Sequence, residues 1–394
     1  MASAAKPGAG SDQGAVSTRP QEDEVAHKHA RGLPTYDELP AFRGLKGCAW
    51  ELWGKDDELG TVNLLTEDVI QRAAKQEIRT GRTVCLNWPL QFPSRPAFGR
   101  KIPSILTFAK DNPGLPIRDD VIHINTQSGS QWDGLKHYGL EEYNVFYNKQ
   151  SLSDGNLEIH DPSEIDRVRI KLGIHNFAKH GICGRAVLLD LVEYYTSDTG
   201  SELSYDPWSP HALSVADLEA CARKEGVVFR QGDILLLRVG FIQKYYASSI
   251  EEKHYLGTGR EAEKFAGIEQ SEDMKRFLWN NHFAAIASDQ PSMERWPPLP
   301  GVQPLHPTII GLWGMPIGEM FDLEGLSQVC KETGRYTFFF TSWPLHIIGG
   351  AASPPNAAVS VPWFHRHGQK SENMASGVLL IYATAVCNNN VLCM

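Results

Sequence analysis

The chain has 394 residues and carries 38 lysines and arginines against 47 aspartates and glutamates, a formal net charge of −9. This mildly acidic balance, without a cluster of basic residues, gives no reason to expect nucleic acid or an anionic membrane as a partner. The seven cysteines are widely spread and include no C-x-x-C pair, which argues against a disulfide framework and a cysteine-held zinc site.

The composition of the first 33 residues predicts a disordered tail. They are rich in alanine, glycine and serine, contain an acidic run at residues 22–24 and lack the apolar core of a signal peptide. The longest apolar run of the chain, Gly377–Cys387, is far shorter than the ~20 residues of a membrane-spanning helix and predicts a buried strand. We therefore expect a cytoplasmic protein.

From residue 34 onwards, strand-like and helix-like segments alternate without a low-complexity linker, which predicts an α/β fold with a large sheet. Ser214, three places before Asp217, is typical of a helix start. The proline-rich segments Pro291–Pro307 and Pro354–Pro362 are interpreted as ordered loops, so one domain over residues 34–394 is preferred to two or three. The predicted strands are Thr83–Leu90, Ser104–Ala109, Val121–Gln127, Ala186–Leu189, Asp233–Val239, Phe283–Ser288, Tyr336–Thr341 and Val378–Val386. The predicted helices are Glu67–Gln76, Val215–Lys224, Glu261–Phe265, Ser271–Asn280 and Leu323–Lys331.

One polar segment follows a predicted strand directly. In an extended chain Gln127, Gln131 and Asp133 point to the same side, with Gly129 between them. A glycine in such a row permits a close backbone approach, and His137 lies where a turn brings its imidazole back toward Asp133. A solvated strand end with a satisfied histidine is the alternative, and the spacing leaves both interpretations open.

A second candidate is Glu319, which follows the apolar segment Gly314–Gly318, with His306 upstream. A buried glutamate must be paired, bound to a metal or shifted in pKa. The alternative role, capping the helix predicted from Leu323, suits Asp322 better because it is closer. The nucleophile-elbow, phosphate-loop and H-E-x-x-H signatures are absent.

At these two places the sequence resembles the cyclase family of metal-dependent hydrolases, which includes bacterial kynurenine formamidases and isatin hydrolases. Residues 127–137 match the spacing of the family signature H-x-G-T-H-x-D-x-x-x-H without a gap, and Gly129, Asp133 and His137 agree with it. Both early histidine ligands are replaced, by Gln127 and Gln131, a pattern similar to the branch of the family met in fungal secondary-metabolite pathways. Further similar segments are Gly184–Asp190, Gly232–Arg238 and Ala287–Ser292, and His306 and Glu319 fall where the family has its late ligands.

The resemblance implies a central mixed sheet, partly barrel-like and of the swivelling β/β/α type, with helices outside, in homodimers or homotetramers. It also implies that His137 is the acid/base, with Glu319 as a second catalytic group. Because amide oxygens suit Mn²⁺ or Mg²⁺ better than Zn²⁺, a bound cation is expected to be one of the first two, and a site without metal is the alternative. The implied metal ligands are Gln127, Gln131, Asp133, His306 and Glu319.

Three residues are candidates for substrate binding. Trp53 resembles the N-terminal aromatic residue that family members bring to the pocket, Trp132 lies inside the matched signature, and Asp289 belongs to the segment similar to G-x-D-x-x-S. For the two tryptophans, packing in a core or an interface carries equal weight.

The resemblance implies hydrolysis of an amide or lactone in a small aromatic or cyclic metabolite, as in an arylformamidase, with His137 moving the proton of a metal-activated water. The first alternative is a metal-free cyclase or dehydratase acting on a secondary-metabolite intermediate. A non-catalytic binding protein on the same scaffold is the weaker alternative.

Overall fold

The computed structural model describes residues 32–79, 81–110, 113–152, 157–197, 202–259 and 261–361. The second of two units of the chain begins at Thr35 and contains all the elements described below. The predicted strand Val378–Val386 and the predicted tail up to residue 31 lie outside the described residues. Within the described ranges, no helix has both the length and the apolar character needed to cross a membrane.

The described residues contain a mixed sheet of nine strands that curls like part of a barrel, as the resemblance implied. Its middle is parallel, from β5 to β10, and both sides are antiparallel. In sheet order the strands are β1 (Arg82–Cys85), β13 (Ala357–Val361), β11 (Thr337–Ser342), β5 (Ile182–Asp190), β7 (Ile234–Arg238), β9 (Ala285–Ser288), β10 (Ile317–Glu319), β4 (Gln131–Asp133) and β12 (Ala352–Ser353).

Burial explains the sequence patterns of these strands. Every residue of β5 and β7 is buried, as expected for parallel strands with both faces covered, and their sequences are nearly continuous apolar runs. The strand β11, nearer the side of the sheet, alternates between buried and half-buried residues. The α/β fold with a large sheet, predicted from these runs, is confirmed.

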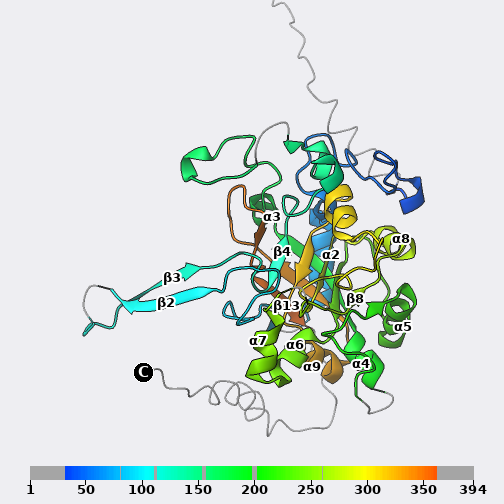
Figure 1. Cartoon of the computed structure of the whole chain (residues 1–394). Coiled ribbons are helices and arrows are strands. Elements are labelled where there is room, and N and C mark those ends of the chain that lie inside the picture. Colours follow the sequence, from blue (N-terminus) through cyan, green and yellow to red (C-terminus); the bar gives the residue numbers. More distant parts are fainter. Residues whose placement is uncertain are drawn as a thin grey trace, which may run out of the picture. The chain divides into compact units, whose positions relative to one another are not determined.

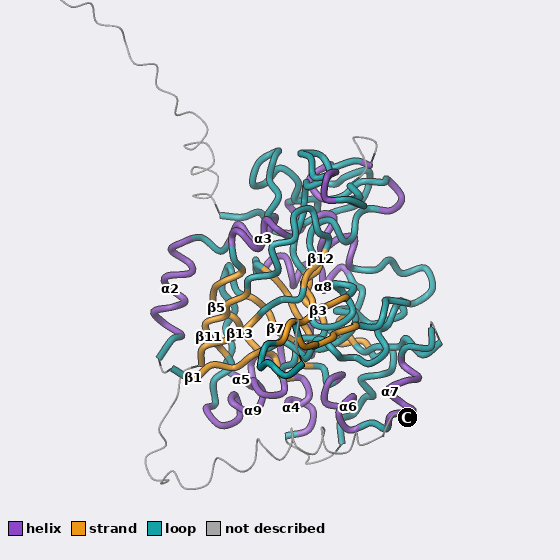
Figure 2. The backbone as a smooth tube through the Cα atoms, turned by 90° about the vertical axis from the view of Figure 1, so that its left-hand side faces the viewer, coloured by secondary structure: helices purple, strands orange, loops and turns teal. Residues whose placement is uncertain are grey.

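The helices cover the sheet, and α4, α6, α7 and α9 lie together along one side of the strands (Figure 2). Ser214 caps α5 by accepting a hydrogen bond from the Asp217 backbone, as predicted, and Asp322 accepts one from Glu324 where α9 begins. The α-helices are α2 (Glu67–Glu77), α3 (His175–His180), α4 (Leu191–Thr196), α5 (Val215–Glu225), α6 (Phe241–Ala247), α7 (Ile250–Leu256), α8 (Glu272–Asn280) and α9 (Glu324–Thr333). Short 3₁₀-helices span Tyr36–Glu38, Gly60–Leu64, Glu141–Tyr143, Tyr147–Lys149 and Pro162–Glu164, and a π-helix spans Pro307–Leu312.

Four predicted elements are wrong in part or in full. The strand Thr83–Leu90 ends early, because β1 stops at Cys85. The helix Glu261–Phe265 is absent, because Phe265 instead exchanges two backbone hydrogen bonds with Trp296. The segment Pro354–Pro362 was interpreted as a loop, yet it contains β13. This strand pairs with β1 on one side and with β11 on the other, so it forms backbone hydrogen bonds along both edges. The strand Val121–Gln127 ends early, at a turn that begins at Asn125.

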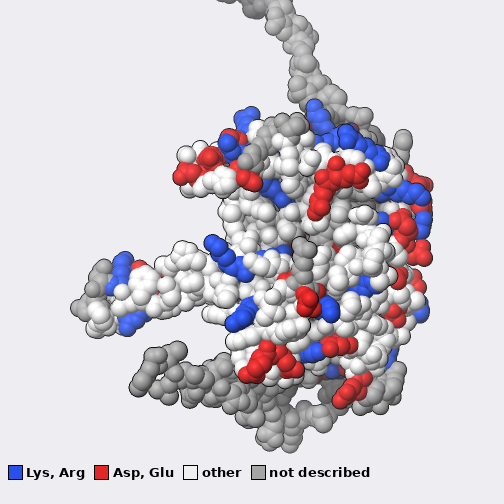
Figure 3. All heavy atoms as spheres, in the orientation of Figure 1, with Lys and Arg blue, Asp and Glu red and all other residues white. Residues whose placement is uncertain are grey.

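Two smaller sheets lie apart from the large one. The strands β6 (Ala212–Leu213) and β8 (Gly267–Ile268) form a short parallel pair. The strands β2 (Ser104–Ala109) and β3 (Arg118–His123) form an antiparallel hairpin that projects from the helices and the large sheet (Figure 1). Apolar side chains on this hairpin are exposed, including Leu106, Phe108 and Ile122, and its surface is largely uncharged on the face in view (Figure 3).

Candidate functional site

Two short antiparallel strands hold the acidic centre of the site. In the pairing of β4 with β10, Gln131 lies opposite Glu319, and Asp133 lies opposite Ile317. Because side chains alternate along a strand, Gln131 and Asp133 point to one side of β4 and Trp132 to the other. The short strands therefore bring two carboxylates and an amide to one side of the sheet.

The amide of Gln131 bridges these two carboxylates. Its Nε2 donates to Glu319 Oε2 at 2.7 Å and to Asp133 Oδ1 at 3.2 Å, and the side chain is fully buried. Its Oε1 is buried and has no hydrogen-bond partner among the described residues. A buried acceptor without a partner is costly, so this oxygen marks a place where a donor or a cation fits.

Gln127 joins the cluster through a turn rather than through an extended strand. Ser128 donates its backbone N–H to Asn125, which reverses the chain before β4. Gly129 then passes so close to the Phe92 carbonyl that a Cβ would lie 2.7 Å from its oxygen, which confirms the predicted close approach. As a result, Gln127 Nε2 lies 2.7 Å from Asp133 Oδ1 and 2.9 Å from His137 Nδ1.

His137 and Tyr138 lie where the chain leaves β4. The Nε2 of His137 is 3.9 Å from Asp133 Oδ1, as the four-residue spacing predicted, because a turn returns the chain at Gly134. Burial lowers the pKa of His137 below its ordinary value, although the charge of Asp133 opposes this shift. The ring of Tyr138 lies 5.9 Å from the His137 ring and 5.7 Å from that of His306.

His306 lies between two buried glutamates. Its Nδ1 is 2.6 Å from Glu294 Oε1, and its Nε2 is 3.3 Å from Glu319 Oε1. Burial alone would lower the pKa of His306, but the hydrogen bonds and charges of the two glutamates outweigh it and raise the pKa to about 10. The π-helix Pro307–Leu312 begins directly after His306, and such helices are frequent at functional sites.

Glu294 is a member of the site that the sequence did not reveal. Its carboxylate accepts hydrogen bonds from the backbone N–H of Leu305, from the backbone N–H and the ring Nδ1 of His306, and from the side-chain amide of Gln270. A fully buried glutamate in a proline-rich loop is the same signal that pointed to Glu319. It was missed because it matches no position of the resemblance.

The charges of the cluster do not balance. Asp133, Glu294 and Glu319 are at most 2% exposed, and no lysine or arginine in the described part of the chain forms an ion pair with them. His306 supplies one positive charge at most. Burial, followed by the charge of Asp133, raises the pKa of Glu319 above its ordinary value.

Three of the predicted metal ligands converge. Asp133, His306 and Glu319 each present one ligand atom, and these atoms lie within 4.8 Å of one another. The two glutamines lie beside them but turn their amide nitrogens toward the carboxylates. A rotation of either amide by 180° exchanges its nitrogen and its oxygen, so both also have a conformation that presents an oxygen.

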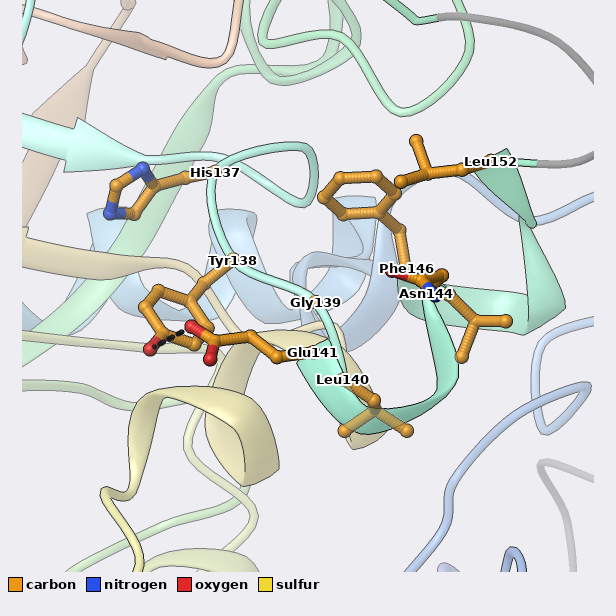
Figure 4. Close-up of a pocket in the computed structure, with 9 residues that line it drawn as sticks. His137, Tyr138, Gly139, Leu140, Glu141, Asn144, Phe146 and Leu152 are labelled. Atoms are coloured by element: carbon orange, nitrogen blue, oxygen red, sulfur yellow. Dashed lines mark hydrogen bonds between the residues drawn. The ribbon is translucent and has the colours of Figure 1, made fainter.

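A cavity of about 280 Å³ borders the cluster. It is formed mainly by the loop after His137, and the imidazole points away from Phe146 and Leu152 in Figure 4. The Tyr138 hydroxyl bonds to Glu141 within this loop at 2.7 Å (Figure 4). The cavity therefore adjoins the cluster at His137. The residues that line it are His137, Tyr138, Gly139, Leu140, Glu141, Asn144, Val145, Phe146 and Leu152.

The three predicted substrate-binding residues take no part in the hydrogen bonds described above for the cluster. Trp132 is fully buried on the opposite side of β4, with its ring 5.1 Å from that of Phe321, so its placement favours packing. Asp289 accepts the backbone N–H groups of Val239 and Gly240 and thereby holds the start of α6. Trp53 is half-buried in a turn, and its indole N–H is buried without a partner among the described residues.

Comparisons with known proteins give the family of the chain and structures similar to it. A family model described as "Putative cyclase" matches residues 87–295, just over half of the chain. A crystal structure described as a novel cyclase is similar, with 28% identity and a TM-score of 0.65, and covers 79% of this chain and 99% of its own. Isatin hydrolase A from Labrenzia aggregata (12% identity, TM-score 0.47) and from Ralstonia solanacearum (16%, 0.46) each cover 71% of this chain, and 93% and 91% of their own. No curated protein matches.

Proposed function

The chain belongs to the cyclase family, and we propose that it is a hydrolase that opens an amide or lactone bond in a small aromatic or cyclic metabolite. One observation carries this proposal: three buried carboxylates lie around His306, and no lysine or arginine of the described residues pairs with them. Buried charge without a partner is expensive, so such a cluster is expected to hold a cation or protons.

The residues present fit a divalent cation. Asp133, His306 and Glu319 have ligand atoms close enough to share one ion, and a 180° rotation of the Gln131 amide would turn its unpartnered oxygen toward them. A set dominated by oxygen favours Mn²⁺ or Mg²⁺ over Zn²⁺. A bound cation of this kind lowers the pKa of a water molecule and polarises a carbonyl group.

His137 is proposed as the group that moves the proton. It lies beside Asp133 and Gln127, with its side chain 21% exposed, so it is held in place and still reaches solvent. In this proposal His137 takes a proton from water and returns it to the leaving nitrogen or oxygen. Gln127 orients the imidazole through its amide.

Metal analysis of the purified protein tests this function. We expect close to one equivalent of Mn²⁺ or Mg²⁺, and hydrolysis of at least one member of a panel of N-formylkynurenine, isatin-like amides and aromatic lactones. A chelator should remove both the ion and the activity, and the ion should restore them. Absence of hydrolysis over the whole panel by metal-loaded protein would contradict the proposal.

His137→Ala should lower the turnover number by about 10²-fold or more, because the variant has no group to accept the proton of water. His160→Ala is a matched control, since that histidine is exposed and its imidazole pairs with Glu158. The measurement is kcat for both variants on the same substrate. A rate for His137→Ala within threefold of the control would remove His137 from the mechanism.

A second candidate function is proton transfer without a metal, as in a cyclase or dehydratase. It is favoured by the hydrogen bonds of the carboxylates, because the amides of Gln127 and Gln131 already donate to Asp133 and Glu319. Here His137 and Glu319 act as the acid/base pair. Turnover that persists at full rate in a chelator, in protein without stoichiometric metal, would establish this function in place of the first.

The assembly and location of the protein stay predictions. Sedimentation equilibrium gives the mass of the assembly and so tests the homodimer or homotetramer that the resemblance implies. Imaging of the tagged chain tests the predicted cytoplasmic location. The third interpretation, a non-catalytic binding protein, is excluded as soon as any substrate is turned over and His137→Ala is inactive.

A further inference from the structure

Arg100 approaches the site from the loop that precedes β2. Its guanidinium carbon lies 5.1 Å from the centre of the Phe98 ring, and its Nη1 donates to the Gln127 carbonyl at 2.9 Å. The side chain is partly exposed. These two contacts hold the planar group by one face and one nitrogen, so its orientation is set before any ligand arrives.

Arg100 has no acidic partner among the described residues, unlike the two buried arginines of the sheet. Arg185 pairs with Glu77 and Asp233, and Arg238 pairs with Asp190 and Glu324. The remaining N–H groups of Arg100 form no hydrogen bond within the described chain and face solvent.

Gln127 links Arg100 to the proposed acid/base group, His137. Gln127 receives the Arg100 hydrogen bond on its backbone, while its side chain contacts both Asp133 and His137. Gln127 therefore places Arg100 within one residue of His137.

We propose that Arg100 is the anion-binding residue of this site and that the natural substrate carries a carboxylate. The guanidinium fork matches a carboxylate in two parallel hydrogen bonds, which fixes the substrate's distance and its orientation together. This inference rests on the proposed function only in placing the reacting bond beside His137. The binding of an anion by Arg100 needs neither a metal nor turnover.

The test compares two small aromatic ligands of the same shape, benzoate and benzamide, which differ in charge. Their dissociation constants are measured by calorimetry on the full chain at pH 7 and low salt. A chelator is present throughout, so that benzoate cannot bind through a metal. We expect the wild-type protein to bind benzoate about tenfold more tightly than benzamide, because a charge-assisted pair at a partly exposed site has about this strength.

Three variants decide the origin of that preference. Arg100→Gln should remove it, and Arg100→Lys should keep only part of it, because a lysine lacks the planar fork. Lys101→Gln is the matched control: it removes the same charge one residue away, from an exposed position, and should keep the preference. Thermal unfolding of each variant shows that it is folded.

The outcomes separate the inference from the proposed function. Equal affinity of the wild-type protein for both ligands, including no measurable affinity for either, would overturn the role of Arg100. So would a preference that survives in Arg100→Gln or disappears equally in Lys101→Gln. If the preference behaves as expected and no hydrolysis is found, the anion site stands and the proposed function fails.

Discussion

The large sheet contains two buried polar clusters that are built in opposite ways. In the first, here called the arginine network, Arg238 lies between Asp190 and Glu324 with nitrogen to oxygen distances of 2.8 Å. In the second, the site cluster of Asp133, Glu294, His306 and Glu319, the three acids contact the imidazoles of His306 and His137 and the amides of three glutamines. Both acids of the first cluster have an arginine partner, and among the described residues the acids of the second have none.

The positions of the clusters explain this difference. Asp190 and Arg238 are the last residues of the adjacent parallel strands β5 and β7 and lie opposite each other in register. Their pairing therefore ties two central strands to α9 through Glu324. The site cluster lies on β4 and β10 and the loops next to them. Buried charge that the fold does not neutralise is typical of sites that bind or transfer a charged species.

Removing a charge from each cluster should give opposite results for stability, and this is the largest effect we expect. Arg238→Met leaves Asp190 buried without its cation and should lower the free energy of unfolding by ~3–5 kcal/mol. Glu319→Gln removes one of three acids around the single imidazolium of His306 and should leave the free energy within ~1 kcal/mol or raise it. Urea unfolding of both variants measures the contrast.

Two controls sharpen this comparison. Arg223→Met removes an exposed arginine from α5 and should change stability little. The Glu319→Gln variant should also lose metal binding and activity while it stays folded. If Glu319→Gln is as destabilising as Arg238→Met, the site cluster is a structural network like the other one.

The two glutamines give the next largest expected effect. The double substitution Gln127→His with Gln131→His replaces two amides by imidazoles and should raise the affinity for Zn²⁺ by about 10²-fold, equal to ~2.7 kcal/mol. Competition with a chromogenic zinc chelator measures it. Gln328→His, on the exposed face of α9, is the control. An unchanged affinity would mean that the two side chains do not converge on an ion.

The smallest effect concerns Glu225, an acid beside the arginine network that has no ion pair in the described part of the chain. One of its oxygens accepts the Asp190 backbone N–H, the other is buried without a partner, and burial raises its pKa from 4.5 to about 8. A raised pKa in the folded state stabilises the fold below pH 4.5, and this contribution is lost as the pH rises toward 8.

Glu225→Gln keeps that position neutral at every pH. The variant should therefore match the wild-type protein near pH 4.5 and exceed its free energy of unfolding at pH 8. Denaturant titrations at both pH values measure the difference. Glu219→Gln, exposed on the same helix, should show no such dependence. A gain that is equal at both pH values would show that Glu225 is already charged in the folded protein.

The candidate site was predictable where its residues are close in the chain. Gly129, Asp133 and His137 lie within nine positions, and both the close approach at Gly129 and the turn that returns His137 are confirmed. The extended row through Gln127 was wrong in detail, because a backbone hydrogen bond at Ser128 reverses the chain there. The same side chains meet, but by a turn.

The contacts of Glu294 and Asp289 depend on distant parts of the chain. Glu294 enters the site because the backbone N–H and the ring Nδ1 of His306 both contact its carboxylate. Asp289 was a substrate candidate, yet it accepts two backbone N–H groups at the start of α6. No local pattern distinguishes a carboxylate that holds a helix from one that serves a site.

The sequence by itself determined long apolar strands such as β5 and β7, the longer helices and the family, because hydrophobic periodicity, helix caps and the signature at residues 127–137 are all local. It did not reveal the short strands β4 and β10, which carry the site. Only the tertiary structure decided which buried acids have an arginine partner. Arg238 reaches Asp190 across 48 positions, and Gln131 reaches Glu319 across 188. Whether a buried acid meets an arginine depends on which strands become neighbours in the sheet, and this pairing separates the arginine network from the site cluster.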